Sequence, residues 1–116
     1  MMAKYQWSIF WANLDPCKGS EQAGRRPVLV ISREEANEVL PIVSIVAITS
    51  LKEGRRIYPT EVLLRSDQTS LGKDSIAMVH QIRAVSKERL EEKSGEITSD
   101  ELKDKIRNAI NMYFDL

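Results

Sequence analysis

Short apolar runs, separated by polar segments that contain the glycines, dominate the pattern along this chain. The β-branched and aromatic runs predict strands at 9–14, 27–31, 42–48 and 61–64. A further run, 76–85, predicts either one long strand or a tight pair of strands. Because residues 27–31 are apolar at every position, we expect that strand to be covered on both faces. The pattern as a whole predicts a small, strongly curved antiparallel sheet.

Two capping-box patterns predict helices. Ser32-Arg-Glu-Glu35 predicts a short helix that ends near Leu40, ahead of a proline. Thr98-Ser-Asp-Glu101 predicts a terminal helix, whose apolar side chains fall on one face: Leu102, Ile106, Ala109, Ile110 and Tyr113. We expect this helix to pack on the sheet. Two alternatives stay open: Phe114 and Leu116 leave apolar surface for a partner chain, or the helix is wholly absorbed in one chain's core.

Composition and length bound the class of protein. The 116 residues are 29% charged and 42% hydrophobic, which predicts a globular protein of one domain, residues 1–116. No apolar stretch approaches the roughly 20 residues that span a bilayer, and the N-terminus has no apolar signal region, so we expect no membrane partner. A single cysteine fits a reducing compartment. These features favour a cytoplasmic location.

The charges balance overall but are unevenly distributed. The formal net charge is zero, which by itself is not typical of a nucleic-acid binder. However, three predicted loops, 15–26, 49–59 and 65–73, contain eight Lys and Arg residues against four Asp and Glu. If the loops share one face, that face can bind a phosphate backbone. The alternative is that the loops are simply charged.

Several familiar catalytic patterns are absent from the sequence. There is no glycine-rich phosphate loop, no GxSxG turn and no metal-ligand spacing of Cys and His. We therefore expect no metal site and no cofactor. A catalytic pair of Cys17 and His80 is conceivable, although a cysteine in a loop is usually incidental.

Four residues supply what metal-free RNA cleavage needs. The ribose 2′-oxygen must lose a proton as it attacks phosphorus, the leaving 5′-oxygen must gain one, and the pentacoordinate phosphate needs support. Arg26, ahead of a strand, offers a permanently charged fork to phosphate oxygens. The Thr49 hydroxyl can hold another phosphate oxygen. Glu21 or His80 could transfer protons, since histidine is the side chain that ordinarily titrates near neutrality.

Each of these residues also has a plainer interpretation. Arg26 could pair with Asp15 or Glu21, and Thr49 could satisfy backbone groups at a strand end. His80 lies between apolar neighbours and could be a packed, hydrogen-bonded histidine. Glu21 could cap a turn or neutralise a neighbouring arginine. From these residues alone, the sequence predicts a β-rich domain that binds an anion.

A resemblance to a known family sharpens this prediction. The block Gly19-Ser-Glu-Gln-Ala-Gly-Arg-Arg-Pro27 is its most specific part. Further matching segments follow in order: 9–16, 26–32, 45–50, 61–64, 74–77, 80–83 and 87–90. Together they resemble the MazF/PemK (Kid) toxins, the RNA-cleaving half of bacterial toxin–antitoxin pairs. The resemblance implies an SH3-like small barrel with a C-terminal helix, a two-fold homodimer and a cognate antitoxin that occludes the RNA groove.

The resemblance also implies an activity and its residues. The activity is metal-independent cleavage of single-stranded RNA, such as mRNA, that leaves a 2′,3′-cyclic phosphate and a 5′-hydroxyl. Arg26 matches the family's catalytic arginine, Thr49 its phosphate-positioning threonine, and Glu21 a glutamate implicated in some members. His80 departs from the family, which often has an acidic residue there. Trp7-Ser8 also departs, because the family commonly has Gly followed by Asp or Glu.

The groove of the expected dimer should contact RNA through both polar loops. We expect RNA-binding residues at Ser20, Gln22, Ser50, Lys52, Arg55, Arg56 and Gln81, with the loop 49–59 gating the groove. Arg55 and Arg56 are expected to contact phosphates rather than bases. Two other functions are kept open: a gyrase-inhibiting toxin of the same fold, and an inactive member that only binds RNA or antitoxin.

Overall fold

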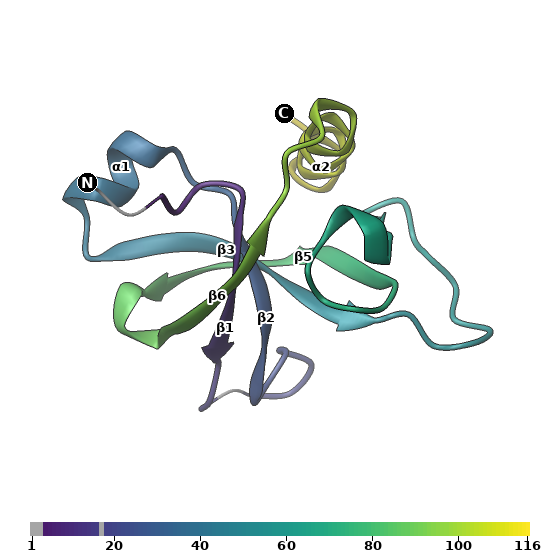
Figure 1. The fold of residues 1–116 in the computed structure, drawn as a ribbon, viewed down its shortest axis with the longest axis horizontal. Coiled ribbons are helices and arrows are strands. Elements are labelled where there is room, and N and C mark those ends of the chain that lie inside the picture. Colours follow the sequence, from purple (N-terminus) through teal and green to yellow (C-terminus); the bar gives the residue numbers. More distant parts are fainter. Residues whose placement is uncertain (1–3, 17) are drawn as a thin grey trace.

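Six antiparallel strands form one curved sheet in a computed structural model that describes residues 4–16 and 18–116. The strands are β1 (Ser8–Asn13), β2 (Arg25–Val30), β3 (Ile42–Ser50), β4 (Glu61–Leu64), β5 (Ser75–Ser86) and β6 (Leu90–Glu96). Their order across the sheet is β4-β5-β3-β2-β1-β6, so β4 and β6 are its edges. The loop between β3 and β4 projects away from the sheet (Figure 1). The expected mainly β fold with a terminal helix is confirmed. The curved sheet is not fully closed, but it is compatible with the expected small-barrel-like fold.

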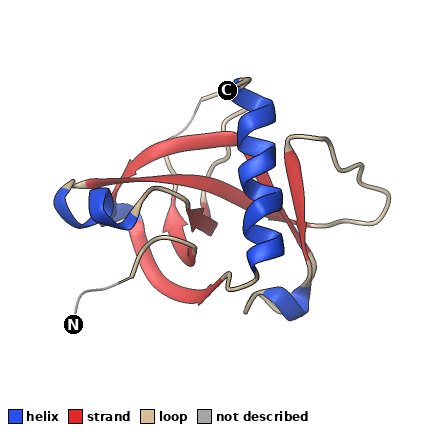
Figure 2. Cartoon of the chain, turned by 90° about the horizontal axis from the view of Figure 1, so that it is seen from above, coloured by secondary structure: helices blue, strands red, loops and turns tan. Residues whose placement is uncertain are grey.

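Two apolar cores occupy opposite faces of this sheet, because side chains alternate along each strand. In β2, for example, Leu29 belongs to one core, whereas Val28 and Val30 belong to the other. Helix α2 (Asp100–Phe114) crosses the first face, as Figure 2 shows, and buries Leu102, Ile106 and Ala109 there. This burial on both faces confirms the expectation for the run 27–31.

Strand β5 is one bent strand, which decides between the two alternatives for residues 76–85. Its pairing with β3 changes register, so that Ile45 faces Arg83 while Ala47 faces Met78. The residues between Met78 and Arg83 therefore bulge out of the ladder opposite β3. Bulges of this kind bend a strand and re-aim its side chains. His80 and Gln81 lie in this bulge.

The short helix predicted from the first capping-box pattern is present, but the predicted cap at Ser32 is wrong. Helix α1 spans Glu34–Val39, with Arg33 as N-cap and no side-chain cap. The Ser32 hydroxyl instead donates to Asn37 at 2.5 Å and accepts from the Ser44 backbone amide at 3.0 Å. Ser32 is thus used to join the helix to β3 rather than to start the helix.

The second capping-box pattern predicted the terminal helix correctly, but the helix cap lies one residue later than the pattern indicated. Ser99, not Thr98, is the N-cap of α2, and its hydroxyl accepts from the Leu102 amide. The far end of the helix is open: Met112, Tyr113, Phe114 and Leu116 are all exposed. Of the two alternatives for this helix, the structure therefore supports apolar surface left uncovered in the single chain. No helix among the described residues is long and apolar enough to cross a bilayer.

Trp7 explains one of the departures from the family pattern. Its φ is 65°, a left-handed backbone conformation that suits glycine and strains a large residue. The buried ring lies beneath α2, with Lys103 and Arg107 over its face. Its amide donates to Val30 and its carbonyl accepts from Ile97, each at 2.8 Å. A tryptophan here holds α2, which offsets the backbone strain.

Candidate anion-binding site

The sheet register brings Arg26 and Thr49 together. Strands β2 and β3 pair with Val28 opposite Ala47. The same register, continued by two residues, places Arg26 across from Thr49. The two residues, far apart in the sequence, therefore meet where β2 begins and β3 ends.

A pocket of about 430 Å³ opens at this point of the sheet. Arg26 and Thr49 both line it, together with Trp11, Arg25, Pro27, Ile48, Ser50, Lys52, Leu71, Lys73 and Ser75. These residues include four cations and three hydroxyls but no carboxylate. Such a lining attracts a phosphodiester and offers hydrogen bonds to its oxygens. Each of the three basic loops of the sequence contributes a cation to this one pocket.

Arg26 and Thr49 keep their functional atoms available for a ligand. The Arg26 Nε donates to the Ala23 carbonyl at 3.1 Å, which orients the guanidinium, and no carboxylate among the described residues pairs with it. The suggested partners are engaged elsewhere: Asp15 accepts from the Gly24 amide and Glu21 from the Lys18 amide. The Thr49 hydroxyl forms no hydrogen bond within the described part of the chain. The plainer interpretations of both residues therefore find no support.

Arg25 lies beside Arg26 but differs in its partners. It forms ion pairs with Glu91 and Glu92 of β6, at 2.6 and 2.5 Å, and its guanidinium lies over Trp11. The hydrogen bond that Arg25 donates to Glu91 is the main cause that raises the pKa of Arg25 above its ordinary value. Arg25 thus joins the pocket lining to β6, whereas Arg26 pairs with no carboxylate in the described part of the chain.

The loop between β1 and β2 does not bring Glu21 into the pocket lining. Its carboxylate accepts from the Lys18 amide at 2.7 Å, so it caps a turn. Ser20 is exposed and Gln22 is half-buried. The Ser20 carbonyl accepts from the Gln81 side chain at 3.1 Å, which joins this loop to β5. Cys17 lies outside the described residues, and with it the suggested Cys17–His80 pair.

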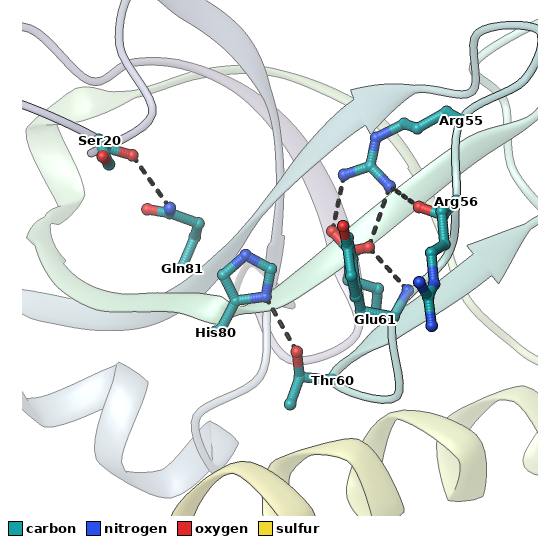
Figure 3. Close-up of polar contacts among 8 residues, drawn as sticks. Ser20, Arg55, Arg56, Thr60, Glu61, His80 and Gln81 are labelled. Atoms are coloured by element: carbon teal, nitrogen blue, oxygen red, sulfur yellow. Dashed lines mark hydrogen bonds and ion pairs between the residues drawn. The ribbon is translucent and has the colours of Figure 1, made fainter.

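His80 belongs to a second polar cluster, at the bend of β5 (Figure 3). Its Nδ1 lies 3.1 Å from the Thr60 hydroxyl, next to Glu61 at the start of β4. His80 is half-buried and is not part of the pocket lining. The structure therefore does not bring His80 together with Arg26 and Thr49.

Arg55 is committed to this same cluster. Its guanidinium makes two hydrogen bonds to Glu61, at 3.0 and 2.8 Å, and the Glu61 side chain is only 1% exposed. Arg56, by contrast, is exposed and lies over the Tyr58 ring. Of the two arginines, only Arg56 is left accessible for a phosphate.

Sequence reasoning did not single out Lys73, Ser75, Arg25 and Trp11 as site residues. Lys73 lies just ahead of β5 and Ser75 is its first residue, which pairs with Ser50 at the end of β3. The signal that could have found them is this pairing, which requires knowledge of the strand order. Among the described residues, no three side chains of His, Cys, Asp or Glu gather where they could hold a metal ion.

Fold and site together define a small β protein with a cationic pocket at the ends of two central strands. The family model of PemK-like, MazF-like toxins of type II toxin–antitoxin systems matches residues 5–114, and the chain belongs to this family. It is 36% identical over 108 residues to "Endoribonuclease MazF" of Staphylococcus saprophyticus, covering 93% of this chain and 88% of that protein.

Solved structures show the same fold. The crystal structure of MazF from Deinococcus radiodurans is 27% identical and superposes over 100% of both chains with a TM-score of 0.80. A MazE–MazF structure from the same organism is 25% identical, with a TM-score of 0.73 over 100% of this chain and 98% of that one.

Proposed function

We propose that this protein is a sequence-specific, metal-independent endoribonuclease, the toxin of a type II toxin–antitoxin system. The observation that carries the proposal is the meeting of Arg26 and Thr49 in one cationic pocket. Family membership and the relative named "Endoribonuclease MazF" support RNA as the substrate. The products would be a 2′,3′-cyclic phosphate and a 5′-hydroxyl.

We assign a part in the reaction to each group of the pocket. The Arg26 guanidinium would bind the phosphate oxygens that gain charge as the 2′-oxygen attacks, and Thr49 would donate to another of these oxygens. Lys52 and Lys73 would hold the flanking phosphates, because no described carboxylate neutralises them. These fixed cations would supply the charge stabilisation that a metal ion supplies in other nucleases.

Proton transfer is assigned to the loop that precedes Arg26. Glu21 is the proposed group because it matches the glutamate implicated in some family members; in the free chain its carboxylate accepts from the Lys18 amide outside the pocket lining, so the role requires the loop to rearrange when RNA binds. The remaining RNA contacts would come from Ser20, Gln22, Ser50 and Arg56. We assign His80 and Gln81 to holding the loops, because each bonds to a loop residue.

The partners follow from the same family. We propose that the chain forms a homodimer in the cytoplasm and binds a cognate antitoxin. Its similarity to the structure described as MazE–MazF supports a protein partner. Light scattering of the purified protein should give twice the 13.2 kDa mass of one chain. The exposed apolar end of α2 is one surface that a partner chain would cover.

Arg26→Ala tests the proposed function. In EDTA, wild-type protein should cleave a pool of short single-stranded RNAs, and Arg26→Ala should cleave at least about 100-fold more slowly, as expected for a lost transition-state donor. Arg33→Ala, at an exposed arginine beside α1, is the control and should cleave normally. Normal cleavage by Arg26→Ala would show that the site is wrongly assigned.

Two other results would redirect the proposal. Protein that leaves RNA intact yet traps gyrase on DNA would indicate the gyrase-inhibiting class. Protein that binds RNA without any turnover would indicate an inactive binding member.

A further inference from the structure

The loop between β3 and β4 is fastened by a buried carboxylate. Glu61, the first residue of β4, accepts two hydrogen bonds from the Arg55 guanidinium and one from the Tyr58 amide, at 3.1 Å. Its side chain is 1% exposed, whereas that of Arg55 is 29% exposed. A buried carboxylate without its cation is strongly unfavourable, so the pair resists separation.

Apart from this pair, the loop is joined to neighbouring segments at its two ends: the Leu51 amide donates to the Asp74 carbonyl, and Thr60 bonds to β5 through its carbonyl and its hydroxyl. Residues 52–54 and 56–59 are all exposed. Within the described chain, the Arg55–Glu61 pair is the one ion pair that joins this loop to the sheet. Arg55 also donates to the Arg56 carbonyl at 2.6 Å, so one guanidinium fixes both the loop backbone and the strand (Figure 3). The conformation of the middle of the loop therefore depends on this contact.

The same loop shapes the anion-binding pocket. Lys52 lines the pocket of Arg26 and Thr49. It also lines an adjoining depression of about 550 Å³, which Arg55, Gly54 and Lys73 help to form. A change at Arg55 would thus move Lys52, the cation that lines both the pocket and the depression.

We propose that Arg55 and Glu61 are positioning residues that hold the loop 51–60 in its RNA-binding conformation and thereby set which sequences are cleaved. The inference rests on the proposed function, and it gives Arg55 a part that needs no direct contact with RNA. The pair acts through the placement of Lys52 and Arg56.

Two variants test this inference. Glu61→Gln keeps the shape of the side chain but removes its charge, and Arg55→Lys keeps the charge but loses the two-pronged contact. Glu35→Gln, which removes the carboxylate of an exposed Arg33–Glu35 pair, is the matched control. The readouts are kcat and KM on a short RNA, and the sequences around the cut sites in a random RNA pool.

Both variants should raise KM more than they lower kcat, and kcat/KM should fall on the order of 10- to 100-fold, as for other misplaced binding groups. The cut-site sequences should broaden, which a loss of stability alone would not produce. Glu35→Gln should match the wild type. Arg55→Lys keeps the inference testable if Glu61→Gln does not fold.

Hydrogen exchange of segment 51–60 without RNA separates this inference from the proposed function. Faster exchange is expected in both variants and not in Glu35→Gln. Wild-type exchange, or an unchanged cut-site profile in a folded variant, would overturn the positioning role. A wild-type protein that cleaves no RNA would instead overturn the proposed function.

Discussion

Single side chains in this protein are distinguished by the partners they have. Arg25, Arg26 and Arg55 are all arginines of the basic loops, but their partners differ. Arg25 and Arg55 form ion pairs with carboxylates. Arg26 pairs with no carboxylate among the described residues, and its Nε donates to the Ala23 carbonyl. An arginine that is oriented without being neutralised is suited to bind an incoming anion.

The stability of the protein should depend on pH through Glu61. The Arg55 hydrogen bonds lower the pKa of this carboxyl below its ordinary value, against the opposing effect of burial. A lowered folded-state pKa means stabilisation that is present above the unfolded pKa and lost as pH falls through the folded one. Glu61→Gln should therefore unfold more easily at pH 7, by about 2 kcal/mol, below the usual range for buried pairs because Arg55 is partly exposed.

Urea unfolding at a series of pH values measures this effect. The gap between wild type and Glu61→Gln should shrink as pH falls below about 4. A gap that stays constant into acid would show that the ion pair does not stabilise the fold.

The candidate residues Arg26 and Thr49 could be predicted as a pair only in part. Their residue types and their places at strand ends follow from the sequence. Their meeting depends on the β2–β3 register, and the contributions of Lys73 and Ser75 depend on the order of strands. His80 shows the opposite case: its chemistry suggested catalysis, but the bulge of β5 aims it at Thr60.

At the scale of elements, apolar strands were predictable and the polar edge strand was not. Strands β1 to β5 each coincide with a predicted apolar run, and β4 has the predicted bounds. Strand β6 has the sequence LEEKSGE and lacks an apolar alternation, so no pattern indicated it. It forms because its backbone pairs with β1, while its charged side chains remain in water and protect the edge.

The N-terminus of α2 offers a test at this scale. Ser99→Ala should destabilise the protein by about 1 kcal/mol, because the Leu102 amide loses its cap. Thr98→Ala, one residue earlier, should leave the melting temperature nearly unchanged. Equal effects of the two substitutions would contradict the assignment of Ser99 as the cap.

The whole molecule combines a neutral net charge with a concentrated basic pocket. The zero net charge of the chain concealed this separation, because acidic residues such as Glu101 and Asp104 lie on α2 rather than in the pocket lining. The positive electrostatic potential that an RNA strand meets is therefore concentrated at the pocket. Its strength should be visible as salt dependence.

Binding of a non-cleavable RNA, with a 2′-deoxy sugar at the cut site, should weaken as salt is raised. Lys73→Gln should reduce the slope of log Kd against log salt by about 0.7, the share of one contact to single-stranded nucleic acid. Lys105→Gln, on α2 and paired with Glu101, is the control and should keep the wild-type slope. Equal slopes for all three proteins would place RNA elsewhere on the surface.

The two tryptophans of the chain lie in different functional regions. Trp11 lines the cationic pocket, and Trp7 lies under Lys103 and Arg107 of α2. Indole fluorescence responds to nearby charge and solvent, so each ring is an intrinsic optical reporter. With Trp7 replaced by Phe, emission follows filling of the pocket; with Trp11 replaced, it follows undocking of the helix. Both events can thus be timed in unlabelled protein.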